Sequence, residues 1–125
     1  MRLFAKNKSS INGQAICPGD KSISQRAIII GALANQDISI SGFLKGEDPL
    51  STLSALNQIG ADISMTNNVV NINKRENPFN NPSNSIDLGN SGTGMRLMMG
   101  LIAGTSLKAK LIGDESLMKR PMSRV

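Results

Sequence analysis

The chain has 125 residues, of which 39% are hydrophobic and 18% charged, which is a globular composition and excludes a disordered or collagenous chain. Fourteen Lys and Arg against nine Asp and Glu give a net charge of +5, and these basic residues are dispersed rather than gathered into a polybasic tail. With three Phe, no Tyr and no Trp, base stacking on aromatic side chains is not expected, and small anions are better suited as ligands than nucleic acid.

Rare residue types limit the chemistry further. No His occurs, which excludes Ser-His-Asp catalysis, Cys-His catalysis and zinc sites that contain His. Cys17 is the only cysteine, so no disulfide forms within the chain, and we expect it to be a small buried side chain in a reducing compartment. The first residues lack the apolar segment of a signal peptide, and no apolar run has membrane-spanning length. We therefore expect a cytoplasmic protein.

The first half of the chain predicts alternating strands and helices. Apolar residues recur at intervals of three or four where a helix is expected, and alternate with polar residues where a strand is expected. The predicted elements are, in chain order, two strands from residue 2 to residue 19 around a turn at Asn12-Gly13, a helix over 22–34, a strand over 37–43, a helix over 49–59, a hairpin of 61–65 and 69–72 that turns at Asn67-Asn68, and a polar loop over 74–84. Ser22 or its neighbour is expected to cap the first helix, and Asp48 the second.

The second half repeats this order. Its predicted elements are a short strand over residues 85–88, a glycine-rich turn over 89–93, a helix over 94–104, a strand over 107–112 and a helix that starts near Glu115.

The two halves also align by residue. Residues 22–34 align with 92–104, so that Arg26 falls on Arg96 at an offset of 70, and GEDPL at 46–50 aligns with GDESL at 113–117 at an offset of 67. A chance likeness of two amphipathic helices is the alternative. The second copy ends at Val125 before its last helix is complete, so we expect a fragment.

Residues 19–26, GDKSISQR, form the first candidate anion site. The free N–H groups of a helix start attract anions, and Arg26 lies one turn after Ser22, so both can face one ligand. An ammonium at Lys21 together with a guanidinium suits a phosphate beside a carboxylate. The alternative is an exposed helix start with ordinary surface cations.

Residues 89–96, GNSGTGMR, form the second candidate, because three glycines let a ligand approach the backbone. The stretch is neither a P-loop nor a GxGxxG motif, and the alternative is a plain turn in which Arg96 bridges loops. The third stretch is 114–122, DESLMKRPM, where Asp114 or Ser116 can cap a helix and Arg120 adds charge. By itself it is typical of a solvated helix face.

Taken together, PGDKSISQRA, GEDPLST, LGNSGTGMRLMMGL and GDESLMKRPM resemble, in order and spacing, the amino-terminal half of 5-enolpyruvylshikimate-3-phosphate synthases over residues 11–125. UDP-N-acetylglucosamine enolpyruvyl transferases share the repeat but lack KSxSxR. The resemblance implies an α/β (α+β) fold, the enolpyruvyl transferase-like inside-out α/β barrel of βαβαββ units about a pseudo-threefold axis, incomplete here. It implies leading strands over 1–20 that cross toward another domain, a first unit over 21–84 and a partial second unit over 85–125.

The same resemblance implies transfer of the enolpyruvyl group of phosphoenolpyruvate to the 5-hydroxyl of shikimate 3-phosphate, in the shikimate pathway of aromatic amino-acid biosynthesis. The family uses no metal and no organic cofactor. Its acid–base carboxylates lie beyond Val125, so this chain alone is expected to be inactive and to need the carboxy-terminal part of the enzyme as partner. The rival interpretation is a non-catalytic α/β module that binds a phosphorylated metabolite or nucleic acid.

Residue roles follow from the resemblance alone. Lys21, the expected catalytic residue, would contact both substrates, and Ser22 and Arg26 would hold shikimate 3-phosphate. The expected phosphoenolpyruvate residues, besides Lys21, are Asn90, Gly92 and Arg120, and the expected supporting residues are Thr93, Arg96 and Asp48. Family members with Ala at the position of Gly92 tolerate glyphosate, so Gly92 implies a glyphosate-sensitive pocket. Gln25 stands where His or Asn is usual, at a position that varies in the family.

Overall fold

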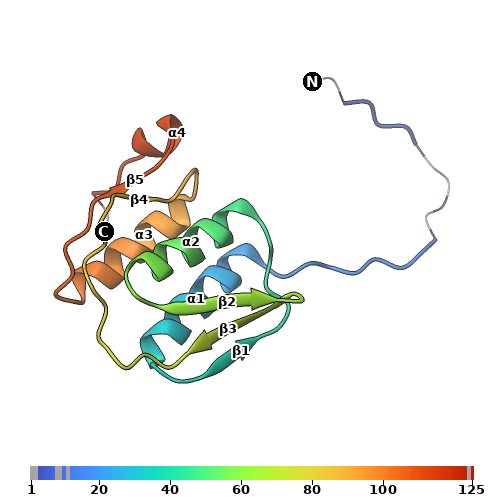
Figure 1. Cartoon of the computed structure of the whole chain (residues 1–125). Coiled ribbons are helices and arrows are strands. Elements are labelled where there is room, and N and C mark those ends of the chain that lie inside the picture. The colour runs from blue at the N-terminus through green and yellow to red at the C-terminus, as the bar shows by residue number, and fades with distance from the viewer. Residues whose placement is uncertain (1–2, 8–9, 11, 124) are drawn as a thin grey trace.

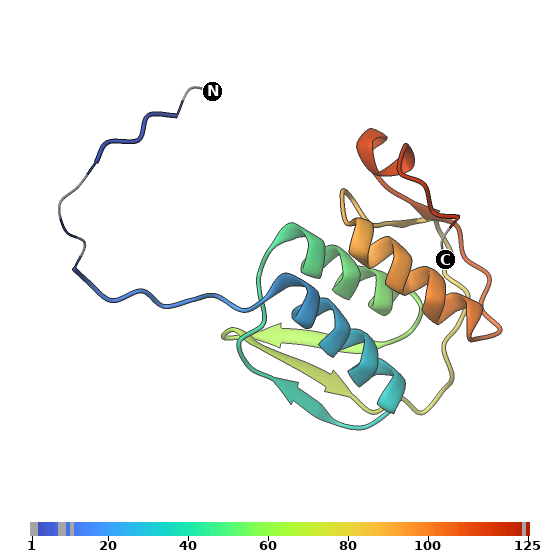
Figure 2. The same ribbon diagram turned by 180° about the vertical axis from the view of Figure 1, so that it is seen from behind.

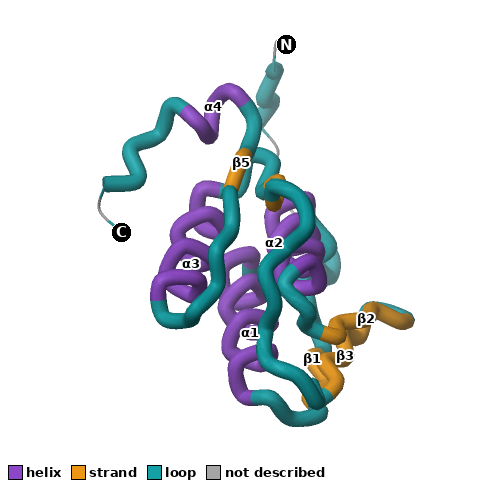
Figure 3. Tube along the Cα trace, turned by 60° about the vertical axis from the view of Figure 1, so that its left-hand side comes forward, coloured by secondary structure: helices purple, strands orange, loops and turns teal. Residues whose placement is uncertain are grey.

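The computed structural model describes residues 3–7, 10, 12–123 and 125. Three long helices lie side by side and start at the same end of the molecule (Figures 1 and 2). They are α1 (Lys21–Ala34), α2 (Glu47–Gln58) and α3 (Gly92–Ala103). A three-stranded sheet covers α1 and α2, and α3 packs against them on the side away from the sheet (Figure 3). The common direction of the helices brings their amino-terminal ends together.

The three-stranded sheet is antiparallel in the order β1-β3-β2. Its strands are β1 (Ile38–Ile40), β2 (Asp62–Thr66) and β3 (Val69–Asn73). Asn67 and Asn68, which connect β2 to β3, have positive φ values of 49° and 69°. Two-residue hairpin turns that match the twist of the strands require this conformation, and Asn adopts it readily. The predicted hairpin and its turn are confirmed.

A second, smaller sheet contains β4 (Ile86–Asp87) and β5 (Leu111–Ile112), which pair in parallel. The short helix α4 (Glu115–Met118) follows β5. Because the strands are parallel, the chain leaves both at the same edge of the sheet, and the N–H of Asp114 donates to the Gly89 carbonyl over 2.8 Å. This pairing places the glycine-rich turn beside the start of α4.

The core is built almost entirely from aliphatic side chains and Met. Ile28 of α1, Leu56 of α2 and Met98 of α3 are all fully buried, and Phe43 is the one aromatic residue in the buried cluster of the described chain. On each helix the buried apolar residues recur at intervals of three or four along the inner face, as the sequence predicts. Among the described residues, no helix has both the length and the apolarity that a bilayer crossing demands.

The two strands predicted for the amino-terminal arm are wrong in the part that the structure describes. Residues 3–7, 10 and 12–20 form no strand and lead away from the helices (Figure 1). Leu3, Phe4 and Ile16 are at least 83% exposed. An isolated hairpin is marginal in water without a further strand or a helix to cover it, and the described chain offers this arm neither. Residues 1–2, 8–9 and 11 of that prediction lie outside the described residues.

Cys17 lies on the same arm and is exposed, so its predicted burial is wrong. Cysteine is among the residue types most often buried in proteins. Burial of a particular cysteine depends on packing, and Cys17 lies on a segment that packs against no helix or strand of the described chain.

The predicted helices exist, but the caps predicted for the first two are wrong. Asp20 rather than Ser22 caps α1, because its carboxylate accepts the Ile23 N–H over 2.7 Å. Gly46 rather than Asp48 precedes α2, so Asp48 lies inside the first turn, where an acidic side chain is stabilised by the helix dipole. In the second half, α3 begins two residues earlier than predicted, and the strand predicted over 107–112 is confined to Leu111–Ile112. Asp114, one of the two predicted caps, caps α4.

Candidate anion-binding site

The starts of the three long helices meet at a buried polar cluster formed by Gln25, Thr52 and Ser91. The Gln25 side-chain amide lies 2.9 Å from the Thr52 hydroxyl, 2.8 Å from the Ser91 hydroxyl and 3.1 Å from the carbonyl of Asp48. All three cluster residues are inaccessible or nearly so. One side chain of α1 therefore reaches the first turns of both α2 and α3, and buried polar groups so joined hold the helices in one register.

The sequence reasoning missed the importance of Gln25, although a signal was present. Gln25 falls on the same stripe as Ile28, Ile29 and Ala32, which are all buried. A polar side chain on a buried helical stripe requires hydrogen-bond partners from other elements. Its partner Ser91 lies 66 residues away, which no local pattern reveals.

Gly94 is where the third helix comes closest to this cluster. A Cβ atom added there would lie 2.7 Å from both the Ser91 and the Thr52 hydroxyl oxygens and 3.1 Å from the Gln25 amide nitrogen. Ser91 also caps α3, since its hydroxyl accepts the Gly94 N–H over 3.0 Å. A glycine is required at this position because no side chain fits between the helices.

In the first candidate group, Lys21 is joined directly to Asp48 of α2. The Lys21 ammonium lies 2.8 Å from the Asp48 carboxylate and is half exposed. Ser22 is half-buried and Arg26 exposed, one turn apart on α1. No ion pair holds Arg26 within the part of the chain that the structure describes. This group thus presents two cations near the start of one helix.

The second candidate group gathers two arginines over Gly92. A Cβ atom added to Gly92 would lie 2.9 Å from an Arg120 guanidinium nitrogen and 3.3 Å from one of Arg96. Arg96 donates to the carbonyls of Gly92 (3.3 Å) and Pro121 (3.4 Å), so it bridges the glycine-rich turn and the segment after α4. Thr93 is half-buried beside them. The two guanidinium groups therefore occupy the place that a side chain at position 92 would need, and two such groups side by side favour the binding of an anion.

Asn90 connects Arg120 to a carboxylate. Arg120 donates to the Asn90 side-chain carbonyl over 2.6 Å, and the Asn90 amide donates to the Asp114 carboxylate over 2.6 Å. The hydrogen bond from Asn90 lowers the pKa of Asp114 below its usual value of 3.8, the Leu117 backbone N–H lowers the pKa further, and the Arg120 charge acts in the same direction. Asp114 is therefore ionised at neutral pH.

The two groups lie at the same end of the helices. Gln25 lies between Ser22 and Arg26 in the sequence, Ser91 lies between Asn90 and Gly92, and the hydrogen bond between Gln25 and Ser91 joins the two stretches. Positive helix ends together with Lys and Arg side chains form a site for anions.

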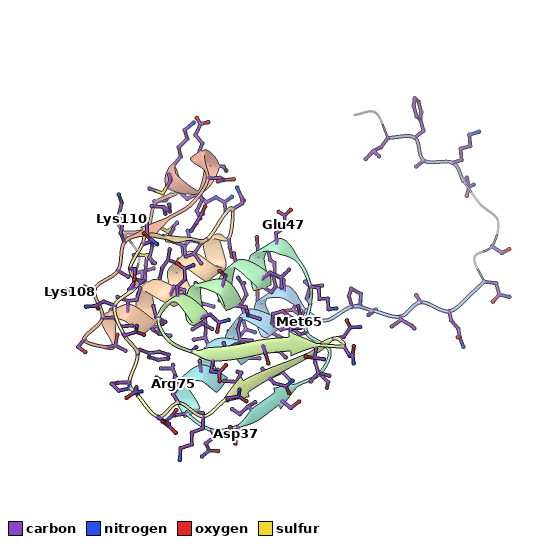
Figure 4. The ribbon with its side chains drawn as sticks, viewed as in Figure 1. Asp37, Glu47, Met65, Arg75, Lys108 and Lys110 are labelled. Carbon is purple, nitrogen blue, oxygen red and sulfur yellow. The ribbon has the colours of Figure 1, made fainter. Side chains whose placement is uncertain are left out.

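Lys108 and Lys110 lie outside the two candidate groups (Figure 4), and the described residues contain no metal-binding cluster. Lys108 and Lys110 lie on the connection from α3 to β5, at the left of Figure 4, while Glu47 at the start of α2 points away from the ribbon. No group of three metal-ligating Cys, Asp or Glu side chains occurs among the residues that the structure describes. The chemistry that the arrangement favours is the binding of small phosphorylated or carboxylated molecules.

Comparison with known proteins identifies a family. The family model of EPSP synthase (3-phosphoshikimate 1-carboxyvinyltransferase) matches residues 5–125. The chain is 46% identical to a 3-phosphoshikimate 1-carboxyvinyltransferase of Ruthia magnifica over 99% of its length, and 40% identical to one of Shouchella clausii over 100%. It spans 29% of the length of each of these relatives. An EPSP synthase structure from Acinetobacter baumannii matches 90% of the chain with a TM-score of 0.81 and 40% identity, over 26% of that protein.

Proposed function

The chain belongs to the EPSP synthase family, and on this premise we propose that it supplies one wall of an active site that transfers the enolpyruvyl group of phosphoenolpyruvate to the 5-hydroxyl of shikimate 3-phosphate. The observation that carries the proposal is the convergence of Arg96 and Arg120 over Gly92, joined through Ser91 and Gln25 to the start of α1. Both substrates are anions that repel each other, and fixed cations with helix ends offset that repulsion.

On the α1 side, we assign shikimate 3-phosphate to Lys21, Ser22 and Arg26. Arg26 has no competing carboxylate among the described residues, and Ser22 lies one turn before it. Lys21 would contact both substrates and act in catalysis. Its ion pair with Asp48 keeps the ammonium near the helix starts, and Asp48 thereby supports the site without contacting the substrate.

On the α3 side, we assign phosphoenolpyruvate to Asn90, Gly92 and Arg120. The absent side chain of Gly92 lets the Arg120 guanidinium lie close to the backbone, where it can face the ligand, and for this reason we also propose that glyphosate binds there. We assign Arg96 and Thr93 to the support of the turn, because Arg96 donates to the Gly92 carbonyl within the turn and to the Pro121 carbonyl in the segment after α4. We propose that the reaction proceeds in the cytoplasm without a metal or an organic cofactor.

The remaining part of the enzyme is the proposed partner. The chain spans 29% of its curated relatives, and an apolar hollow of about 410 Å³ opens between α3, β5 and α4. Met95, Met99 and Ile102 of α3 line it together with Leu117 and Met118 of α4. We propose that residues 21–84 form one repeat unit and 85–125 part of a second, whose further residues fill this hollow. The chain alone then binds substrate weakly and does not catalyse.

The experiment is a titration of the isotope-labelled chain with shikimate 3-phosphate and then phosphoenolpyruvate, followed by NMR. Shikimate 3-phosphate should shift the resonances of residues 21–26, and phosphoenolpyruvate those of 90–96 and Arg120. Arg26→Ala should weaken shikimate 3-phosphate binding about tenfold or more, while Lys108→Ala, which lies away from the helix starts, should not. Phosphate release should require addition of a polypeptide that corresponds to the rest of a relative.

Two results would contradict this proposal. One is the absence of substrate binding and phosphate release in the reconstituted mixture. The other is preferential binding of nucleic acid with a steep dependence on salt, which would favour the rival binding module.

A further inference from the structure

The orientation of the Asn90 side chain is determined by its two neighbours. A carboxylate can only accept hydrogen bonds and a guanidinium can only donate them. Asn90 therefore must direct its amide nitrogen to Asp114 and its carbonyl oxygen to Arg120, as the two 2.6 Å contacts show. The usual ambiguity in the orientation of an Asn side chain does not arise here.

Asp114 uses its two oxygens for two different tasks. Oδ1 accepts the Leu117 N–H over 2.7 Å and thereby caps α4, while Oδ2 accepts the Asn90 amide. Capping alone needs only one oxygen, so the second contact requires a separate explanation.

The contact from Asn90 is the shorter of the two side-chain hydrogen bonds that hold Arg120. The other leads to the Ser116 hydroxyl and is 3.5 Å long. Because the Asn90 side chain is exposed, burial does not hold it in place, and its hydrogen bonds must do so. The position of Arg120 over Gly92 thus depends on Asn90, and Asn90 depends on Asp114.

We propose that Asp114 is a positioning residue for the anion site: it holds the Asn90 amide so that the carbonyl oxygen faces Arg120 and keeps that guanidinium over Gly92. We call the hydrogen bonds that lead from Asp114 through Asn90 to Arg120 the relay. The role of this site in binding phosphoenolpyruvate rests on the proposed function, but the relay does not. The charged groups near Asp114 are Arg120 and, on α4, Glu115, which is paired with Lys119.

The proposal makes a counterintuitive prediction for two matched variants. Asp114→Asn and Asp114→Ser both remove one negative charge beside an anion site, and both residues cap helices well. Simple electrostatics therefore predicts tighter anion binding in both.

The relay separates the two variants. In Asp114→Asn the new side-chain oxygen still accepts the Leu117 N–H, so the new amide nitrogen faces Asn90. Asn90 must then rotate its carbonyl oxygen toward this nitrogen. Its own amide nitrogen consequently faces Arg120, and two donors oppose each other. In Asp114→Ser the shorter side chain does not reach Asn90, which stays free to rotate. Asp114→Asn should therefore bind phosphoenolpyruvate about tenfold more weakly than Asp114→Ser. In an Asn90→Ala background the two variants should bind equally, as a double-mutant cycle requires.

A ligand-free measurement tests the relay separately from the proposed function. In the unmodified chain, the Asn90 side-chain amide and the Arg120 Nε–H resonances should shift together as Asp114 titrates in acid, and neither should shift in Asp114→Ser. An Asn90 amide that does not follow the Asp114 titration would overturn the relay, as would equal affinities of the two variants. If the Asn90 amide resonance shifts with the Asp114 titration as expected, but phosphoenolpyruvate binds to none of the proteins, the proposed function fails and the relay stands.

Discussion

The two halves of the chain, which we propose to be copies of one repeat, differ in how completely their cores are closed. The first copy, from α1 to β3, closes its core with a three-stranded sheet, whereas the second, from β4 to α4, has a two-stranded pair and an open apolar hollow. Both nevertheless start their first helix with a polar cap, Asp20 in one copy and Ser91 in the other. Caps depend on a few consecutive residues, while a closed core depends on segments far along the chain.

The copies also hold their cations differently. In the first, Lys21 contacts the Asp48 carboxylate directly, and in the second, Arg120 reaches Asp114 only through Asn90. By the offset of 67 residues, Asp114 corresponds to Glu47, which points into solvent in Figure 4. Both acidic residues are exposed, but Asp114 accepts hydrogen bonds from Asn90 and Leu117, whereas Glu47 points into solvent (Figure 4).

The largest expected effect tests the difference in packing at equivalent positions. Ile29 and Met99 lie 70 residues apart, the offset that aligns α1 with α3; Ile29 is only 6% exposed, whereas Met99 lines the hollow. Ile29→Ala should lower the free energy of unfolding by ~2–4 kcal/mol, because it leaves a cavity in a closed core. Met99→Ala should cost about 1 kcal/mol or less, because its side chain is partly exposed already. Equal losses in urea denaturation would show that the second copy packs as tightly as the first.

The next effect tests the contact between the copies. Gly94→Ala would force a methyl group against two hydroxyls and the Gln25 amide and should cost ~1–3 kcal/mol. Gly100→Ala is the matched control on the same helix, since its added Cβ meets nothing within 4 Å and should stabilise α3 by up to ~1 kcal/mol. Urea denaturation of both variants measures the difference. Similar stabilities would mean that the helix starts move apart easily.

A smaller and more local effect is expected at Gly92. Gly92→Ala would displace the Arg120 and Arg96 guanidinium groups, which are the flexible ends of their side chains, so stability should change little. Phosphoenolpyruvate should bind about tenfold more weakly, while shikimate 3-phosphate, which we assign to the first copy, should bind as before. Calorimetric titration with each ligand distinguishes the two copies, and a parallel loss of both would make them one inseparable site.

The smallest effect concerns pH. The pKa of Asp114 in the folded chain is below the usual 3.8 because of the Asn90 hydrogen bond above all. The folded state therefore binds this proton less readily than the unfolded state, and the contribution of Asp114 to stability is present above pH 3.8 and is lost as the pH falls through the lower value. The urea midpoints of the unmodified chain and Asp114→Ser should thus differ most near neutral pH and converge in acid. A difference that does not change with pH would assign the stabilisation to capping alone.

Much of the fold could be predicted because its signals are local. The stripe of Ile28, Ile29 and Ala32 predicts α1, and Asn67-Asn68 predicts the hairpin, without knowledge of any distant residue. The prediction of two strands in the amino-terminal arm was wrong for the same reason. Its local pattern indicates strands, but such strands become stable only when another element covers them.

The candidate site divides in the same way. The stretches that contain Lys21, Arg26, Asn90 and Arg120 could be selected from residue type and spacing, and their assigned roles stay predictions. The pairing of Lys21 with Asp48 and the chain from Asp114 to Arg120 could not be predicted, because their members come from separate elements.

By itself, the sequence determined the helices, the hairpin and the membership of a family whose motifs the chain carries. Only the tertiary structure decided that Gln25 joins three helix starts, that Gly94 has no room for a side chain, and that Asn90 stands between Asp114 and Arg120. The physical reason is range. Helix and turn preferences act over a few consecutive residues, whereas hydrogen bonds among helix starts join residues 23 to 66 positions apart, which meet only after the core has formed.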